Sequence, residues 1–283
     1  MDVSVIVPFY KGNKYINNIL EMMKANAARA RNISFEVIIV NDSPEVEIVM
    51  DSTLVEGYEL NIIEHNKNMG IQQARVTGIK QAHGKYILML DQDDKIESRT
   101  LESQYSVVAG GDAVISNGYS MDKNGRITLL FKNRKQMEYA NDFSFYFYFG
   151  NVIASPGLCL IKRELIPELW LNNIMGENGA DDWLLWVAFL NNGRKFVINE
   201  ECLYTHVNDG HNTSNDNEKM IRSSFEALQI AEKSKTFKQK LLGVYYRRLN
   251  MRKTYLNEKK FNKIIAYFKN PDIAIRLMEY KKA

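Results

Sequence analysis

The chain has 283 residues, of which 45% are hydrophobic and 25% are charged, and its formal net charge is +3. This length and composition fit one large α/β domain with an appendage, or two smaller soluble domains. Two cysteines without a CxxC spacing argue against a disulfide framework and against a zinc site.

Export and membrane insertion are not signalled by the sequence. Its apolar runs are far shorter than the roughly 20 residues that span a bilayer. The first ten residues, MDVSVIVPFY, contain neither a basic segment nor a small-residue cleavage site. We therefore expect a cytoplasmic protein.

Charge is distributed unevenly along the chain. Residues 217–283 contain 17 Lys and Arg against 6 Asp and Glu, a net charge of +11, whereas residues 1–216 carry −8. A basic segment of this kind is typical of contact with an anionic partner, and a membrane surface is the partner that we consider first. A solvated, lysine-rich helical surface would produce the same pattern.

Short apolar runs alternate with helical spacing over the first 116 residues. They predict, in chain order, a strand at 3–7, a helix at 13–29, strands at 35–40 and 60–64, a helix at 70–83, and strands at 86–90 and 112–116. Strands separated by helices in this order are typical of βαβ units. We therefore expect an α/β fold with a mostly parallel sheet flanked by helices.

The remainder of the chain is less regular. The aromatic stretch FSFYFYF at 143–149 is interpreted as core packing, and an amphipathic helix is predicted at 180–192. Helices are expected from residue 217 to the end. We therefore divide the chain into a domain at 1–216, with halves at 1–116 and 117–216, and a basic helical extension at 217–283.

Polar residues follow the predicted strands at their carboxyl ends. These positions are Pro8–Tyr10, Asn41-Asp42, 66–70 and 91–94. Ligands of open parallel sheets bind outside this edge, so we expect one binding site there.

Three carboxylates, Asp91, Asp93 and Asp94, crowd into four positions of the stretch YILMLDQDDKI. Like charges this close repel each other. A calcium loop beginning at Asp91 is excluded because Lys95 and Ile96 stand where a ligand and a glycine are required. Helix capping accounts for one aspartate but not for three. A divalent cation on a diphosphate would remove the repulsion, which favours Mn²⁺ or Mg²⁺.

Four motifs in order resemble family 2 glycosyltransferases of the GT-A fold. They read VSVIVPFYKGNKYI, EVIIVNDSP, NKNMGIQQARVTGIKQAHGKYILMLDQDD and GADDWLLW, and together they cover about residues 1–190. The sequence lacks the GxxxxGK[ST] loop of P-loop proteins, and no GxGxxG follows its first strand. The resemblance implies a GT-A (Rossmann-like) sheet, a nucleotide-sugar donor, inverting transfer and a divalent metal.

The resemblance assigns donor binding to residues 1–116. Tyr10 would stack on uracil, and Asp42 would accept a hydrogen bond from N3–H of the base, which favours uracil over cytosine. Arg75 would approach the base or the diphosphate, and Asp91 would contact the ribose or a metal-bound water. Asp93 closes the DxD motif and is the expected metal ligand. The other nucleotide-sugar positions are Pro8, Phe9, Asn68, Gly70 and Gln92.

The pair Asp181-Asp182 falls in the acceptor and catalytic half, residues 117–216. The resemblance makes Asp182 the base that deprotonates the acceptor hydroxyl, a contribution of about 10²–10⁴-fold in rate. Asp181 would orient the acceptor or raise the pKa of Asp182 by repulsion. Capping of the 180–192 helix is the alternative. Trp183 and Phe149 are assigned to the acceptor side, because a tryptophan beside a carboxylate suits a sugar face.

Two positions depart from the family pattern: Lys11 stands where Asn is usual, and Asp181 where Glu is usual. His206 follows the strand-like FVINEECLYTH and matches the histidine that completes the metal shell in many relatives. A structural histidine is the alternative. Residues 212–214 would form a loop that closes over the diphosphate.

The favoured function is an inverting, metal-dependent transfer of a single sugar from a UDP-sugar to an acceptor hydroxyl, in the synthesis of a surface polysaccharide or a lipid-linked oligosaccharide. The basic segment would hold the enzyme on the inner membrane face as a peripheral protein. No QxxRW follows Asp182, which argues against processive synthesis.

Two other functions stay open. A nucleotidyltransferase also uses a parallel sheet and acidic metal ligands, although VPFYKGN is poor in glycine for that class. A catalytically silent module that binds sugar nucleotides or polysaccharides is the second alternative. Nucleic acid is not an expected partner, because the tyrosines of the basic segment suit helix packing or a lipid interface equally well.

Overall fold

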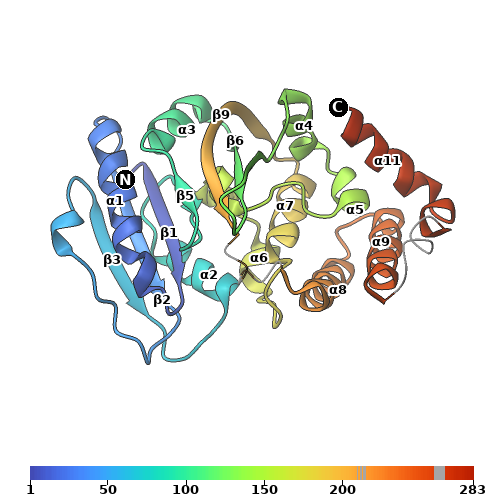
Figure 1. Cartoon of the computed structure of the whole chain (residues 1–283), viewed down its shortest axis with the longest axis horizontal. Coiled ribbons are helices and arrows are strands. Elements are labelled where there is room, and N and C mark those ends of the chain that lie inside the picture. The colour runs from blue at the N-terminus through green and yellow to red at the C-terminus, as the bar shows by residue number, and fades with distance from the viewer. Residues whose placement is uncertain (209, 211, 213–214, 258–264) are drawn as a thin grey trace. The chain divides into compact units, whose positions relative to one another are not determined.

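The computed structural model of the chain describes residues 1–208, 210, 212, 215–257 and 265–283. It consists of two compact units that interleave along the sequence (Figure 1). Unit 1 contains Met1–Phe131, Ala154–Ile166 and Phe196–Asp209, and unit 2 contains Lys132–Ile153, Pro167–Lys195 and Gly210–Ala283. The helices of the basic segment therefore share a unit with two segments from the middle of the chain.

Unit 1 is built on a nine-stranded sheet in the order β3-β2-β1-β4-β8-β6-β9-β5, with β7 paired to β6. Its first four strands are parallel: β1 (Val3–Phe9), β2 (Phe35–Asn41), β3 (Glu59–Glu64) and β4 (Tyr86–Met89). Every residue of β1, β2 and β4 is buried, as expected for parallel strands covered on both faces. β3 alternates between exposed and half-buried residues because it forms the edge.

The other half of the sheet is mixed. β6 (Ala113–Met121) and β9 (Phe196–Val207) are parallel to each other, and β8 (Cys159–Lys162) is antiparallel to both β4 and β6. The short strands β5 (Lys95–Ile96) and β7 (Ile127–Leu129) pair antiparallel with β9 and β6. The β6–β9 register shifts around Asn117, where a bulge interrupts the ladder. Such bulges re-aim the side chains that follow them.

Three helices of unit 1 pack close to the sheet: α1 (Asn13–Arg29), α2 (Ile71–Gln81) and α3 (Thr100–Val108). α1 buries Ile16, Ile19, Leu20 and Met23, the spacing of one helical face. α2 lies against β1 and β2. Gly78 allows this approach, because a Cβ there would lie 2.4 Å from Ile6.

Unit 2 is helical. Its helices are α4 (Arg134–Glu138), α5 (Phe145–Phe149), α6 (Glu168–Asn172), α7 (Asp181–Asn191), α8 (Asn217–Ser234), α9 (Gln239–Asn257) and α11 (Pro271–Lys282). α7 is apolar on all sides after its first turn and is accordingly buried, in contact with α6 and α8. α9 contacts α8 and α5, and α11 contacts α5. Single-turn 3₁₀ helices occur at Ser52–Leu54, Tyr139–Asn141, Pro156–Leu158 and Arg163–Leu165.

The α/β fold with a mostly parallel sheet and C-terminal helices is confirmed. The aromatic stretch at 143–149 is packing material as predicted, since Phe145, Tyr146 and Phe147 of α5 are fully buried. Among the described residues, none of the helices combines the length and apolar character that crossing a bilayer requires.

Candidate active site

The loop after β1 presents Tyr10 at the surface. The Tyr10 side chain is 44% exposed, whereas Phe9 is 1% exposed. The Tyr10 N–H donates to Gln92 Oε1 at 2.9 Å, and Gln92 Nε2 donates back to the Tyr10 carbonyl at 3.1 Å. Gly12 makes room for this exchange, because a Cβ there would lie 2.4 Å from Gln92 Oε1. The loop backbone is therefore fixed while the aromatic ring stays available to a ligand.

Lys11 reinforces the same loop. Its backbone adopts a left-handed conformation (φ 49°), and its N–H donates to Ser43 Oγ at 3.0 Å. Its ammonium lies 5.3 Å from the Tyr10 ring centroid and 3.1 Å from Glu45 Oε1. The lysine that departs from the family pattern thus sits over the face of the tyrosine.

Asp42 is a buried carboxylate at the end of β2, 4% exposed. Oδ1 accepts from the Met69 N–H and lies 2.7 Å from His65 Nδ1, and Oδ2 accepts from the Gly70 N–H at 2.8 Å. Asn68 also accepts from the Gly70 N–H. A carboxylate can accept about four hydrogen bonds, so Asp42 orders the loop before α2 and keeps capacity for one further donor.

Asp91 is held by an arginine from α2. Arg75 Nη2 donates to Asp91 Oδ1 at 2.5 Å, and Ser155 Oγ lies 3.5 Å from Oδ2. The Arg75 side chain is 4% exposed and Asp91 is 21% exposed. The acidic cluster at 91–94 contains no Lys or Arg, and Arg75, sixteen residues upstream, supplies a positive charge beside it.

Asp94 is buried and bonded to three groups of β9. Its carboxylate accepts from the Val207 N–H at 2.8 Å and from the Tyr204 hydroxyl, and Oδ1 lies 3.1 Å from His206 Nδ1. Burial raises the pKa of Asp94, and the hydrogen bond from His206 opposes this effect. The same hydrogen bond raises the pKa of His206. The bulge between β6 and β9 brings Tyr204 and His206 to this position.

Asp93 lies between these two anchored carboxylates. Burial raises the pKa of Asp93 to about 6, and repulsion from Asp94 and Asp91 adds to the effect. His206 acts in the opposite direction. The folded protein thus disfavours the negative charge of Asp93, a condition that a bound cation would relieve.

Asp182 lies in the first turn of α7, in unit 2. Oδ2 accepts from Asn151 Nδ2 at 2.6 Å, and Oδ1 accepts from the Trp183 N–H at 2.7 Å. Asp181 is 3% exposed. The N-cap of α7 is Ala180, and no side chain caps the helix through a hydrogen bond. Asp182 nevertheless satisfies a first-turn N–H, that of Trp183, so its carboxylate also stabilises the start of α7.

A small cavity of about 50 Å³ lies beside Asp182 in unit 2, lined by residues of α5, α7, α8 and α9. Phe149 and Trp183 both contribute to its wall. Trp183 is 1% exposed, its ring stacks on Tyr245 at 4.1 Å, and its Nε1 donates to the Tyr146 carbonyl.

Comparison with known proteins decides the family. The family model described as "Glycosyl transferase family 2" matches residues 4–170, more than half of the chain. The chain belongs to glycosyl transferase family 2. It is a glycosyltransferase enzyme, and this membership sets aside the nucleotidyltransferase alternative.

Similar proteins of this family occur in archaea and bacteria. The uncharacterized glycosyltransferase MJ1057 of Methanocaldococcus jannaschii is 26% identical over 208 residues, which cover 71% of this chain and 69% of that protein. Glycosyltransferase GlyG of Streptococcus pneumoniae is 24% identical over 74% of this chain, and the match spans 60% of that protein. Several other relatives are longer still, with 34% and 46% of their length matched.

The same fold occurs in a solved structure of S. aureus TarS 1–349 in complex with UDP-GlcNAc. Its TM-score against this chain is 0.62 at 21% sequence identity, and the alignment covers 88% of this chain and 72% of TarS 1–349. The likeness supports the GT-A-like fold of the glycosyltransferase.

A divalent metal, which family 2 glycosyltransferases often use, fits the residues of the acidic cluster. Among the described parts of the chain, no three His, Cys, Asp or Glu side chains converge as a self-sufficient metal site. Mg²⁺ and Mn²⁺ need only one or two protein ligands when a diphosphate supplies the others. Because His206 directs Nδ1 at Asp94, Nε2 is the nitrogen that could coordinate a metal, the usual arrangement of a metal-ligating histidine. Asp93 and His206 are therefore the residues suited to hold the cation.

The structure refines the expected roles of several site residues of the glycosyltransferase. The side chain of Phe9 is buried, so it supports the loop after β1 rather than lining a pocket. Pro8 is buried within β1, opposite Val40 of β2. Trp183 presents no open face to a sugar, because Tyr245 covers its ring. Gln92 bonds to the backbone of the loop after β1.

Sequence reasoning missed Tyr204 and Asn151, which hold Asp94 and Asp182 from distant segments of the chain. A second aspartate after DxD was visible, but its partners on β9 were not. Of the predicted diphosphate loop, residues 213–214 lie outside the described residues, as does His211.

Proposed function

We propose that this glycosyltransferase inverts the anomeric centre of a UDP-sugar and moves one sugar to an acceptor hydroxyl, with Mn²⁺ or Mg²⁺ on the donor diphosphate. The observation that carries the proposal is Asp93, a half-buried carboxylate between Asp91 and Asp94 with a pKa raised to about 6. A cation shared with a diphosphate is the chemistry that stabilises such a carboxylate in its charged form.

The donor is assigned from Tyr10, in the loop after β1, and from Asp42, after β2. Tyr10 stacks on the base, and the remaining acceptor capacity of Asp42 takes the N3–H of uracil, a group that cytosine lacks. Gln92 and Gly12 keep the Tyr10 backbone in position for this contact. The solved TarS structures with UDP-GlcNAc and with UDP support a uridine nucleotide as the donor.

The transfer step is assigned to Asp182. The acceptor oxygen forms a bond to the anomeric carbon while the bond from that carbon to the diphosphate oxygen breaks. The proton of the attacking hydroxyl passes to Asp182, and UDP leaves as the anion. The metal, when bound by Asp93 and His206, supplies the positive charge that stabilises the departing diphosphate. Asn151 keeps the Asp182 carboxylate in one orientation through the 2.6 Å hydrogen bond to Oδ2.

The acceptor class is proposed from the relatives. Residues of this chain are 35% identical over 104 positions to the minor teichoic acid biosynthesis protein GgaB of Bacillus subtilis, a match that covers 36% of this chain and 11% of GgaB. This similarity supports a role in the synthesis of a surface polysaccharide or of a lipid-linked precursor.

The basic helices of unit 2 are proposed to contact an anionic membrane on its cytoplasmic face. α11 buries Ile273 and places Tyr280 against α5, while Ile275 and Met278 are 52% and 51% exposed. Phe268, just before α11, is 81% exposed. Exposed apolar side chains next to lysines are typical of helices that lie on anionic lipid.

Binding of UDP, measured by calorimetry with Mn²⁺ and with EDTA, tests the donor assignment. We expect the wild-type protein to bind UDP only with the metal. The Asp93→Ala variant should lose this metal-dependent binding. Equally tight binding of UDP in EDTA would refute the metal requirement. Binding of GDP or dTDP but not of UDP would refute the uridine donor.

A further inference from the structure

The cavity beside Asp182 contains two arginines of the basic segment. Its lining includes Asp182 of α7 and Tyr245, Arg248 and Arg252 of α9. Arg248 and Arg252 are four residues apart, so both lie on the same face of α9. All of these residues belong to unit 2.

These three charged groups all influence the buried hydroxyl of Tyr245. Burial is the main cause that raises the pKa of this tyrosine, and the charge of Asp182 raises it further, while Arg252 and Arg248 lower it. The two guanidinium groups and the carboxylate therefore act on the same buried hydroxyl. With two arginines and one aspartate in the lining, the cavity has a net positive charge.

The size of the cavity limits what it can accept. A volume of about 50 Å³ exceeds the roughly 10–15 Å³ that a cavity needs to hold one water. A compact group of a few heavy atoms fits this volume. Two guanidinium groups on one helical face match the several oxygens of a phosphate, which accepts more hydrogen bonds than a carboxylate does.

We propose that Arg248 and Arg252 form a phosphate subsite for the acceptor, so that the hydroxyl glycosylated at Asp182 belongs to a phosphate-bearing substrate. The inference rests on the proposed function, because it takes Asp182 as the base. It gives the basic segment a role in acceptor selection: an uncharged polyol or sugar with the same hydroxyl leaves the subsite empty and reacts poorly.

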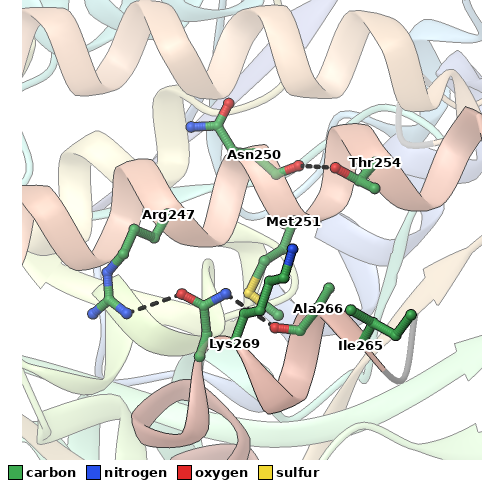
Figure 2. A pocket seen from close by; sticks show the side chains of 8 residues that line it. Arg247, Asn250, Met251, Thr254, Ile265, Ala266 and Lys269 are labelled. Carbon is green, nitrogen blue, oxygen red and sulfur yellow. Dashed lines mark hydrogen bonds between the residues drawn. The ribbon is translucent and has the colours of Figure 1, made fainter. Parts of the chain in front are cut away.

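A larger pocket nearby in sequence does not offer the same chemistry. It measures about 560 Å³ and is lined by residues of α9 and of the segment 265–270 (Figure 2). Arg247 in its wall donates to Asn270 at 2.9 Å and to both carboxylate oxygens of Asp272. Arg247 thus connects α9 to the start of α11, and we assign it a structural role.

Binding of glycerol 3-phosphate, compared with glycerol, tests the subsite directly. We expect the wild-type protein, loaded with UDP and Mn²⁺, to bind glycerol 3-phosphate at least about tenfold more tightly than glycerol in calorimetry. The double variant Arg248→Gln/Arg252→Gln should lose this preference, because both charge-assisted contacts are gone. Arg248→Lys/Arg252→Lys should recover part of it.

Lys253→Gln is the matched control, since it removes one positive charge from an exposed position of the same helix. It should bind glycerol 3-phosphate as the wild type does. Equal binding of glycerol and glycerol 3-phosphate by the wild type would overturn the proposal. So would a double variant that keeps the preference, or one that loses UDP affinity instead, since the arginines would then serve the donor.

The two proposals can fail separately. UDP binding by the double variant reports on the donor site, which contains neither arginine. The glycerol 3-phosphate titration is repeated without UDP and Mn²⁺. If the wild type binds no UDP, the proposed donor fails, while a phosphate preference that depends on Arg248 and Arg252 still supports the anion subsite.

Discussion

Asp93 is a residue whose negative charge costs the folded protein stability. Its ordinary pKa of 3.8 rises to about 6 in the folded protein, because the side chain is half-buried and its neighbours are carboxylates. A raised carboxyl pKa means that the folded state prefers the protonated form. Stability is therefore lost as the pH rises from about 4 to about 6, and the loss persists at neutral pH.

Asp93→Asn should consequently stabilise the protein in the absence of metal. We expect a gain of about 1–2 kcal/mol at pH 7.5, reduced from the full value of the pKa shift because the side chain is partly exposed. At pH 4 the gain should nearly vanish, since the wild-type carboxyl is then protonated in the folded state. Urea unfolding in EDTA at the two pH values measures both quantities.

Glu21→Gln serves as the control for this measurement, because Glu21 is an exposed carboxylate on α1. It should change stability little at either pH. An Asp93→Asn variant that is no more stable than the wild type at pH 7.5 would show that the folded state does not disfavour the charge of Asp93, and the argument for a cation would lose its main support.

At the scale of elements, the contact between β6 and β9 positions the residues that hold Asp94. Gly118 pairs with Tyr204, and a Cβ at Gly118 would lie 2.4 Å from the Tyr204 carbonyl oxygen. The Tyr204 carbonyl and the Gly118 backbone are both held in the sheet. Rotation of a side chain therefore cannot relieve the contact between an added Cβ and this carbonyl. Tyr204 and His206 hold Asp94 from this strand.

Gly118→Ala should therefore separate the two strands locally. We expect a loss of about 2–4 kcal/mol in the free energy of unfolding, together with weaker Mn²⁺-dependent UDP binding. Gly243→Ala on α9 is the control, because no atom lies within 4 Å of the added Cβ. It should leave stability unchanged or raise it by up to about 1 kcal/mol. Equal melting temperatures for Gly118→Ala and the wild type would contradict the close strand contact.

Elements differed in how well the sequence predicted them. β1, β2, α1 and α2 were predicted to within about two residues. β1, β2 and α1 bury mostly apolar residues in a regular pattern, whereas α2 also buries the polar Gln72 and Arg75. β5, β7 and β8 were not predicted. These strands have two to four residues, too few to show a local periodicity. The partners of β5 and β8 also lie far away in the sequence, whereas β7 pairs with the nearby end of β6.

The candidate site followed the same rule. The acidic cluster at the end of β4 was visible as a local motif, and the family resemblance supplied Arg75 and His206. Which carboxylate each of them would contact was not visible, because Arg75–Asp91 and His206–Asp94 are contacts between distant segments. The arginines of α9 were noticed only as part of a basic segment, since a charge count does not show which side chains line a cavity.

At the scale of the whole molecule, the uneven charge distribution supports an interaction with a surface. The +11 of residues 217–283 is confined to unit 2, and part of it has internal partners: Arg247 bonds to Asp272, and Arg276 to Asp142. Lys281 and Lys282 end α11 in exposed positions, close in sequence to the exposed Ile275 and Met278. We expect these groups to supply the membrane contact.

Binding to phosphatidylserine vesicles, measured by sedimentation, checks this expectation. Each lysine near an anionic surface contributes roughly 1 kcal/mol, so Lys281→Gln/Lys282→Gln should weaken partitioning by about thirtyfold. Raising the salt to about 1 M should abolish binding, because the screening length falls to about 3 Å. Phe268→Ser should weaken binding at both low and moderate salt, since its contribution is apolar.

Lys80→Gln/Lys123→Gln is the matched control, because both lysines are exposed but belong to unit 1. It removes the same number of charges and should leave vesicle binding unchanged. If both double variants weaken binding equally, the attraction depends on net charge alone, and α11 has no special role. If the wild type binds neutral phosphatidylcholine vesicles as well as anionic ones, the basic segment is not an anionic-lipid contact, and of its cations only Arg248 and Arg252 keep a proposed ligand.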